Sequence, residues 1–241
     1  MPTSLHQQAV DHLGSRIIDG SVLPGEVVLA SELEDELGFS RSVIREAVRV
    51  LASAGLVVST KRVGIKVQPA EHWNPFDPLV IRWRLASEGQ GAQLRSLTEL
   101  RVAVEPMAAE LAAEHAPAEF CAELLNLAAR MRHAGREGDL DSFLELDIRF
   151  HALVLAASGN EMFANLAHPI GETLRGRTEL GLMPEHPHEE ALAWHQGVAD
   201  AISAHDPKRA RESMELIMRR TVQEIYEVWA HKPRLFPRPV R

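Results

Sequence analysis

Asp147 and His151 are the pair of side chains with the clearest potential for chemistry in the chain. They lie four residues apart in the stretch FLELDIRFHALVL, whose periodicity predicts an amphipathic helix. At about 100° per residue, Glu145 and Arg149 fall on the solvated face of that helix, and the pair falls on the opposite face. Side chains at positions i and i+4 project together, so this carboxylate and imidazole can hold one metal ion.

A third metal ligand must come from another helix, and His195 is the candidate. It lies in LAWHQGVADAI, where apolar residues at helical spacing predict an inward position. The alternative is that all three side chains are satisfied polar groups, with Asp147 paired to an arginine. For a divalent ion bound by nitrogen and oxygen we expect zinc, with nickel, manganese or iron as alternatives.

Three arginines, Arg41, Arg45 and Arg49, recur every four residues and therefore share one face of a predicted helix. The apolar residues of this helix form a stripe on another face: Ile44, Ala47, Val48 and Leu51. An arginine face can lie in the major groove of DNA, where arginine pairs with guanine or clamps phosphate. The alternative is a solvated face of salt bridges.

Residues 1–68 are predicted to fold as three helices followed by a two-stranded wing. Helical periodicity runs from Leu5 to Gly20, and Ser31 with Glu34 forms a capping-box pair that opens a short second helix. Ser40 can cap the arginine helix. The capped helix, the arginine helix and the basic hairpin follow one another in the right order for a DNA-binding module, which favours DNA binding over a solvated face.

The wing is predicted from LVVSTKRVGIKVQ, in which β-branched residues alternate around a basic tip. Lys61 and Arg62 supply the charge, and Gly64 permits close approach of the backbone to a groove. The chain carries a net charge of −8, but residues 41–66 hold six basic residues against one acidic residue, Glu46. Such a local positive excess suits a polyanion.

A second, helical domain is predicted after a proline-rich linker. The segment QPAEHWNPFDP cannot propagate a helix, so we place the linker at residues 69–78. Beyond it helical periodicity recurs over 79–88, 93–115, 117–135, 140–157, 161–181, 189–204 and 207–230. The predicted fold class is therefore mainly α, with an all-α bundle over 79–231 and a C-terminal tail over 232–241.

Composition indicates the cellular compartment. The single cysteine, Cys121, excludes an internal disulfide and suits a reducing environment. No run of about 18 apolar residues could span a bilayer, and the N-terminus lacks a basic segment followed by an apolar one. We expect a cytoplasmic protein with no membrane partner.

The motif SRSVIREAVRVLASAGL, from Ser40 to Leu56, resembles the signature SRxxxREAxxxLxxxGL of the GntR family of bacterial transcription regulators. This resemblance implies a winged helix-turn-helix in which Arg41 and Arg45 contact operator bases or nearby phosphates. The residues expected to support them are Ser40, Arg49, Lys61, Arg62 and Gly64.

The helical domain resembles the FCD effector domain of the FadR-like branch of this family. The matching stretches are ELRVAVEPMAAELAA, ELDIRFHALVLAASGN and HQGVADAISAHDPKRARESM. Many members bind a divalent metal through an Asp and three His, and Asp147, His151 and His195 match the first three. The fourth position is Ile217. The resemblance therefore implies a three-ligand site with open positions for oxygen donors of a small molecule.

The resemblance also places an effector pocket around this site. Arg101 matches an arginine that faces the pocket and could clamp a carboxylate, although it could equally pair with Glu105. Arg175 and Arg177 are further candidates. The segment WNPFDPLVIRWRL resembles that of galactonate-operon repressors. We therefore expect a sugar acid or aldonate such as galactonate or gluconate, with a lactate-like hydroxy acid or an acyl-CoA as alternatives.

Taken together, these features predict a homodimeric repressor that binds double-stranded operator DNA under the control of a small carboxylate. Two-fold pairing of half-sites is the usual way for such a module to gain affinity. The rival hypothesis is a metal-dependent hydrolase or lyase, because open positions on a metal could activate water. No general base or nucleophile stands out beside the candidate ligands, so we expect no enzyme.

Overall fold

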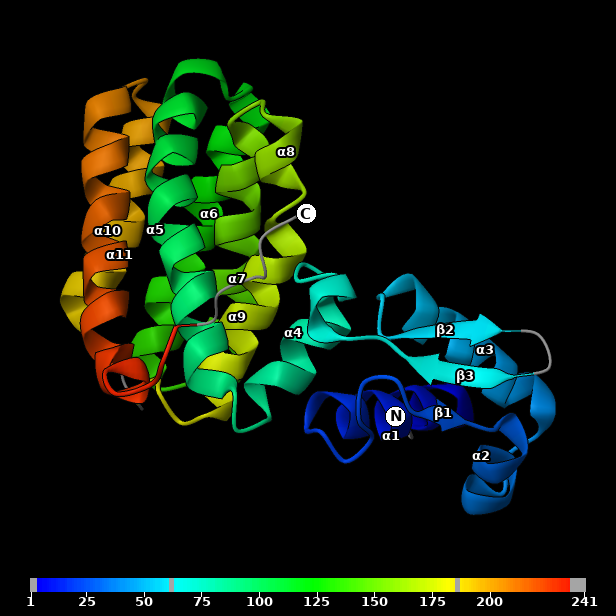
Figure 1. The fold of residues 1–241 in the computed structure, drawn as a ribbon. Coiled ribbons are helices and arrows are strands. Elements are labelled where there is room, and N and C mark those ends of the chain that lie inside the picture. The colour runs from blue at the N-terminus through cyan, green and yellow to red at the C-terminus, as the bar shows by residue number, and fades with distance from the viewer. Residues whose placement is uncertain (1–3, 61–62, 185–186, 235–241) are drawn as a thin grey trace. The chain divides into compact units, whose positions relative to one another are not determined.

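The computed structural model describes residues 4–60, 63–184 and 187–234 (Figure 1). The chain divides into an N-terminal unit and a helical unit, with the boundary between Gln90 and Gly91. Among the described helices, none has the length and apolar character that crossing a membrane requires.

Three helices that share a core begin the N-terminal unit. They are α1 (Leu5–Ile18), α2 (Ala30–Leu37) and α3 (Arg41–Ser53). Apolar side chains at helical spacing, such as Leu13, Ile44 and Leu51, are buried in this core. The predicted helix-turn-helix is confirmed.

The wing is a three-stranded antiparallel sheet, one strand more than predicted. Its strands are β1 (Val27–Val28), β2 (Val57–Thr60) and β3 (Gly64–Val67), in the order β1-β3-β2. The predicted hairpin pairs Val57 with Val67, and β1 adds Val27 opposite Lys66 on the other edge of β3. A two-residue strand is too short to show an alternating pattern, so sequence periodicity could not reveal it.

Helix α2 begins two residues earlier than its sequence suggests. Its N-cap is Leu29, directly after β1 ends at Val28, so Ser31 lies inside the first turn. The Leu29 N–H donates to the Glu32 carboxylate at 3.0 Å. The predicted capping pair of Ser31 with Glu34 is therefore wrong, because strand pairing sets where the helix starts.

Helix α4 (Pro78–Leu85) packs on α1 within the N-terminal unit. It follows a short 3₁₀ helix, η1 (Ala70–His72), and Asp77 caps it by accepting from the Leu79 N–H at 2.9 Å. The Trp83 indole and the Arg82 guanidinium both donate to Asp11 Oδ1, at 3.0 and 2.7 Å. The segment predicted as a linker therefore lies inside this unit.

Gly55 combines a left-handed backbone with a close approach. Its φ is +80°, and a Cβ there would lie 2.1 Å from the backbone oxygen of His72. We expect Gly55→Ala to lower the free energy of unfolding by about 3 kcal/mol, because left-handed alanine costs about 1 kcal/mol and displacing packed backbone costs about 2 kcal/mol more.

Gly20→Ala is the matched control for this prediction. Gly20 has a φ of +82°, and a Cβ added there would meet no other atom within 4 Å. Its substitution should therefore show the left-handed cost alone, about 1 kcal/mol. Equal losses for the two variants in urea denaturation would contradict the clash at His72.

Seven helices form the helical unit. They are α5 (Gln90–His115), α6 (Ala118–Glu137), α7 (Leu140–Ala157), α8 (Glu161–Ala164), α9 (Ala167–Glu179), α10 (Glu189–Ser203) and α11 (Pro207–Trp229), counted over the described residues. The helix predicted over 161–181 is two helices, because Asn165 ends α8 and its side chain donates to the Glu161 carbonyl at 2.8 Å. Helix α5 continues through Pro106.

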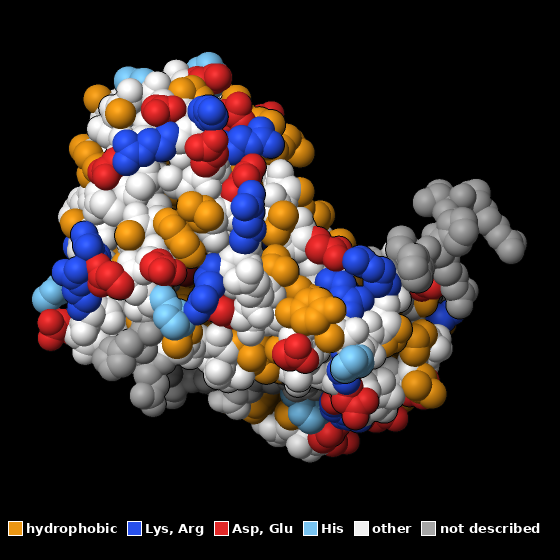
Figure 2. All heavy atoms as spheres, turned by 90° about the vertical axis from the view of Figure 1, so that its left-hand side faces the viewer, with side chains coloured by type: hydrophobic (Ala, Val, Ile, Leu, Met, Phe, Trp, Pro, Cys, Tyr) orange, Lys and Arg blue, Asp and Glu red, His pale blue; other side chains and the backbone are white. Residues whose placement is uncertain are grey.

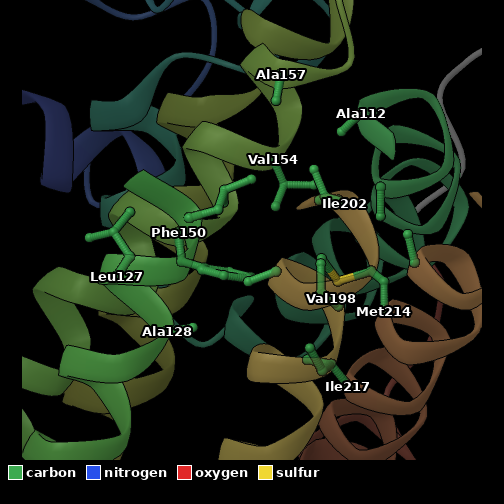
Figure 3. Packing of buried hydrophobic residues seen from close by; sticks show 14 of the residues in the cluster. Ala112, Leu127, Ala128, Phe150, Val154, Ala157, Val198, Ile202, Met214 and Ile217 are labelled. Carbon is green, nitrogen blue, oxygen red and sulfur yellow. The ribbon is translucent and has the colours of Figure 1, made fainter. Parts of the chain in front are cut away.

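The core of the helical unit surrounds α7. Figure 3 shows Phe150 and Val154 of α7 pointing toward Val198 and Ile202 of α10, with Met214 beside them on α11. All five side chains are fully buried. Helix α7 also packs against α6 and α9. Asp147 and His151, which lie on α7, are therefore buried inside the bundle.

Charged side chains of both signs lie close together on the surface of the helical unit. Figure 2 shows acidic and basic groups interspersed with apolar ones on one face. Ion pairs such as those of Glu215 with Arg211 and Arg219 on α11 have this mixed character. A face of mixed sign is unlike the one-sided positive patch that attracts a polyanion.

Candidate metal centre and nucleic-acid interface

Asp147, His151 and His195 meet in the interior of the helical unit. They are 5%, 1% and 5% exposed. Asp147 Oδ1 lies 3.3 Å from Nε2 of His151 and 3.3 Å from Nε2 of His195. One potential ligand atom from each residue lies within 4.8 Å of the other two. The structure thus brings together the three residues that the sequence singled out as metal ligands.

Each histidine has its second ring nitrogen against an oxygen. His195 Nδ1 lies 2.7 Å from the Ala191 carbonyl oxygen. His151 Nδ1 makes an ion pair with Glu105 Oε2 at 2.5 Å, at an angle unsuited to a full hydrogen bond. Both oxygens favour a proton on Nδ1, which directs the Nε2 atoms to a metal ion, as in histidines that bind metals. Arg101 Nη2 lies 3.4 Å from His151 Nε2 and would have to give up that contact when a metal binds.

Buried polar atoms without hydrogen bonds gather at this place. Among the described residues, no hydrogen-bond partner exists for Asp147 Oδ1, His151 Nδ1, His195 Nε2, Arg101 Nη1 or Arg177 Nε. All five residues line one cavity. Unsatisfied buried polar atoms are costly. A bound cation would satisfy Asp147 Oδ1 and His195 Nε2, and an anionic ligand beside it would satisfy the arginine donors. The donor set therefore fits a divalent metal ion.

Buried charges around His151 set its proton affinity. Burial raises the pKa of Glu105, but Arg101, which donates to it at 2.6 Å, and His151 outweigh burial and bring that pKa to about 2. Burial lowers the pKa of His151, but Glu105 and Asp147 outweigh it and raise that pKa to about 9. Without a metal ion, a proton on His151 offsets part of the buried negative charge at neutral pH.

Metal binding here should weaken as the pH falls. A metal ion must displace the proton from His151, whose pKa is raised to about 9, so the proton competes throughout the range below that value. We expect the apparent affinity for Zn²⁺ to fall about tenfold per pH unit between pH 8 and pH 6. Titration calorimetry in a competing chelator measures this slope, and an affinity independent of pH would contradict it.

The cavity beside the cluster takes walls from five helices, α5, α7, α9, α10 and α11. Its open space is about 40 Å³. A water molecule occupies about 30 Å³ in the liquid, and pockets for small molecules usually hold about 300–1,000 Å³. In this conformation the cavity is much smaller than such pockets, so a sugar acid would require it to enlarge.

Ile217 occupies the fourth predicted ligand position. It lines the cavity, is 5% exposed and belongs to the core cluster. Figure 3 shows it on α11, on the same side of the helix as Met214. An aliphatic side chain cannot bind a metal ion, so Asp147, His151 and His195 are the protein ligands that the described residues offer.

The three candidate effector arginines lie in different places. Arg101 and Arg177 line the cavity. Arg175 is not among the residues that line it; it is partly exposed and pairs with Glu145. Two residues along a helix correspond to about 200°, so Arg175 and Arg177 must face opposite ways. The structure therefore does not bring Arg175 to the site.

Three polar residues of α11 also line the cavity, and the sequence analysis did not predict them: Arg220, Thr221 and Glu224. They follow Ile217 by three, four and seven residues, the spacing of one helical face. Extending that face from the fourth ligand position would have identified them.

Helix α3 presents its arginines at the surface of the N-terminal unit. Arg41 is exposed, and the side chains of Arg45 and Arg49 are 67% and 65% exposed. Arg49 donates to the Glu46 carboxylate at 2.7 Å, whereas Arg45 Nε lies 3.7 Å from it. Ser40 is the N-cap, but its hydroxyl lies 2.9 Å from that of Ser42. The arginine face is thus available to a ligand.

The wing tip is described only in part. Lys61 and Arg62 lie outside the described residues. Gly64 has a φ of +127°, and a Cβ there would lie 2.8 Å from a methyl carbon of Val27. Packing against β1 is therefore a structural reason for glycine at this position, beside the expected approach to a groove.

A winged helix-turn-helix unit with an exposed arginine face, followed by a helical unit with a buried ligand site, defines a DNA-binding transcriptional regulator. The chain belongs to the gntR family of bacterial regulatory proteins, whose profile matches residues 5–67, and it carries an FCD domain, matched over residues 96–220. These families are transcriptional regulators, and the chain is not an enzyme.

Relatives align with nearly the whole chain. The galactonate operon transcriptional repressor of Escherichia coli K12 is 29% identical over 220 residues, 90% of this chain and 94% of its own. The uncharacterized HTH-type transcriptional regulator YieP of the same organism is 28% identical over 236 residues, 91% of this chain and 98% of its own. The solved structure of Streptococcus agalactiae GntR has a TM-score of 0.51 at 23% identity, covering 90% and 99% of the two chains, and supports the fold.

Proposed function

We propose that this regulator is a repressor that binds a two-fold symmetric operator as a homodimer and is released by a small carboxylate effector. The observation that carries this proposal is the buried cluster of Asp147, His151 and His195 beside a cavity lined by arginines. A cation site next to guanidinium groups suits an anion with several oxygen donors. We also propose that the protein is cytoplasmic, together with the operator DNA that it binds.

For DNA binding we assign base or phosphate contacts to Arg41 and Arg45. Their exposure on α3 supports this assignment. The supporting contacts are assigned to Ser40, Arg49, Lys61, Arg62 and Gly64. One module makes few contacts, so two modules on two half-sites account better for specific binding, which is the reason for proposing a homodimer.

Asp147, His151 and His195 would hold the divalent ion, for which we propose zinc, with nickel, manganese or iron as alternatives. Bound there, the ion would attract carboxylate or hydroxyl oxygens of the effector. Arg101 holds Glu105, and Glu105 in turn orients His151. Arg101 and Arg177 both line the cavity, but Arg101 is held by Glu105 and so would act on the effector chiefly by positioning the metal ligand His151.

The effector class we propose is a sugar acid or aldonate such as galactonate or gluconate. A relative at 29% identity is a galactonate operon repressor, and the polar groups of the cavity suit a hydroxylated acid. A lactate-like acid is the alternative that fits the same groups. An acyl-CoA would need a long apolar channel, which the cavity does not provide within the described residues.

The test is a titration of the metal-loaded protein against DNA from upstream of its own gene. We expect sequence-specific binding that weakens steeply with salt, because arginine contacts to phosphate release counterions. Galactonate or gluconate should then release the DNA. Absence of specific binding would overturn the assignment of DNA contacts to α3. Absence of release by any small carboxylate would overturn the proposed effector class.

A further inference from the structure

Arg177 is a buried cation that faces the cavity with part of its binding capacity unused. It is 6% exposed, and its carboxylate partner is Glu224 on α11. Its Nε has no hydrogen-bond partner among the described residues. A guanidinium has five N–H donors in a plane and matches a carboxylate best through two of them. The present pairing leaves Arg177 able to take a better placed carboxylate.

Glu224 is shared between two arginines. Its Oε2 accepts from Arg177, and its Oε1 accepts from Arg220 Nε at 2.7 Å. All three side chains line the cavity. The Glu224 side chain is 19% exposed and that of Arg220 is 32% exposed, whereas that of Arg177 is 7% exposed. The carboxylate thus has a route to solvent that Arg177 lacks.

Arg101, in contrast to Arg177, cannot easily exchange its carboxylate partner for that of a ligand. Arg101 and Glu105 are each 1% exposed and bonded at 2.6 Å, and Glu105 is also paired with His151. Removing Arg101 from Glu105 would leave a deeply buried carboxylate without its main partner, which is strongly unfavourable. The pair that can open at low cost is therefore the one between Arg177 and Glu224.

We propose that Arg177 and Arg220 form a carboxylate-binding subsite, and that Glu224 occupies it as an internal substitute until the carboxylate of a ligand takes its place. The proposal rests on the proposed function for the identity of that ligand, but the subsite would accept any small carboxylate. When Glu224 turns toward solvent, the 40 Å³ cavity enlarges by the volume of its side chain.

The exchange would also give the ligand a means of control. The pair of Arg177 with Glu224 joins α9 to α11. A ligand that replaces Glu224 breaks this connection, so the contacts between α9 and α11 would differ between the free and the liganded bundle. Such a difference is what allows a ligand to shift an equilibrium between conformations.

The experiment is chemical rescue of Glu224→Ala in the full-length protein. Loss of the carboxylate leaves Arg177 buried with an unpaired charge, so the Tm should fall by about 6 °C or more. Sodium acetate at about 100 mM should recover about half of that loss by entering the space left by the side chain. Sodium chloride of equal ionic strength and the neutral analogue acetamide should not.

Glu145→Ala is the matched control, because Glu145 also pairs with an arginine of α9, Arg175, but on the exposed surface. Acetate should raise its Tm no more than that of the wild type. If Glu224→Ala does not fold, Glu224→Gln keeps the side-chain volume and removes the competing charge. It should then gain more stability from acetate than Glu145→Gln does.

The outcomes separate the subsite from the proposed effector. Equal responses of the Glu224 and Glu145 variants to acetate would overturn the subsite. Rescue by acetate, together with no binding of galactonate or gluconate to the wild type, would support the subsite and overturn the effector class. Rescue together with tighter galactonate binding to Glu224→Gln would support both.

Discussion

Arg45→Ala should weaken operator binding by about 10- to 100-fold, since a good arginine contact to a base is worth about 1–3 kcal/mol and 1.4 kcal/mol is tenfold. The Arg45 side chain is 67% exposed on α3, and the nearest carboxylate oxygen, on Glu46, is 3.7 Å away. The guanidinium therefore has only this weak ion pair with Glu46 to break before it can bind DNA. Fluorescence anisotropy with labelled operator DNA measures the loss.

The salt dependence of the same titration distinguishes two roles for Arg45. If it contacts a phosphate, the variant should lose about one unit of salt slope and weaken all sequences alike. If it contacts a base, the slope should hold and discrimination should relax at one position. Either result supports the arginine face, and an unchanged affinity would contradict it.

Arg149→Ala is the control for this prediction. Arg149 is 55% exposed on α7 of the helical unit and pairs with Glu123 at 2.9 Å. An exposed pair of this kind contributes little to stability, about 1 kcal/mol or less, so the variant should fold normally. It should also bind the operator as tightly as the wild type, because it removes the same charge from a surface of mixed sign.

The elements that local patterns specify were predictable, and those set by pairing across the chain were not. The apolar stripe of α3, which includes Ile44 and Leu51, follows from helical spacing alone. Strand β1 exists because Val27 and Val28 pair with β3, nearly forty residues later. The same pairing moves the start of α2 to Leu29. A tertiary contact therefore decided both of these differences from the prediction.

The ligand cluster illustrates the same limit. Asp147 and His151 are four residues apart on one helix, so their common direction follows from helix geometry. His195 was predicted to face inward from the apolar residues around it, but only the packing of α10 against the bundle brings it 3.3 Å from Asp147. Glu105, which lies against His151, gave no local signal beyond its i, i+4 spacing from Arg101.

The choice between neighbouring arginines shows why the cavity wall could not be completed from sequence. Arg175 and Arg177 are two residues apart, and the predicted helix over 161–181 did not say which face was buried. Helix α8 ends at Asn165, so α9 is a separate helix that begins at Ala167. Only the resulting packing turns Arg177 toward Glu224, 47 residues later, and leaves Arg175 at the surface.

Asp147→Ala should lower the affinity for a divalent metal by more than about 100-fold, since losing even an outer partner of a ligand costs about 10- to 100-fold and Asp147 is the one carboxylate in the cluster. Two histidines alone supply no negative charge to offset that of the ion. Zinc bound per chain, measured by mass spectrometry after dialysis, should fall from about one to near zero.

Asp141→Ala is the matched control, because Asp141 lies in the first turn of the same helix and is exposed. It should keep its metal, and equal metal content in the two variants would contradict the site.

The effect of Asp147→Ala on operator binding shows what the metal centre is for. Asp147→Ala leaves the arginines of α3 untouched, so it should bind the operator with wild-type affinity and resist release by galactonate or gluconate. Loss of DNA binding itself would mean that the metal centre supports the DNA-binding conformation instead of sensing a ligand.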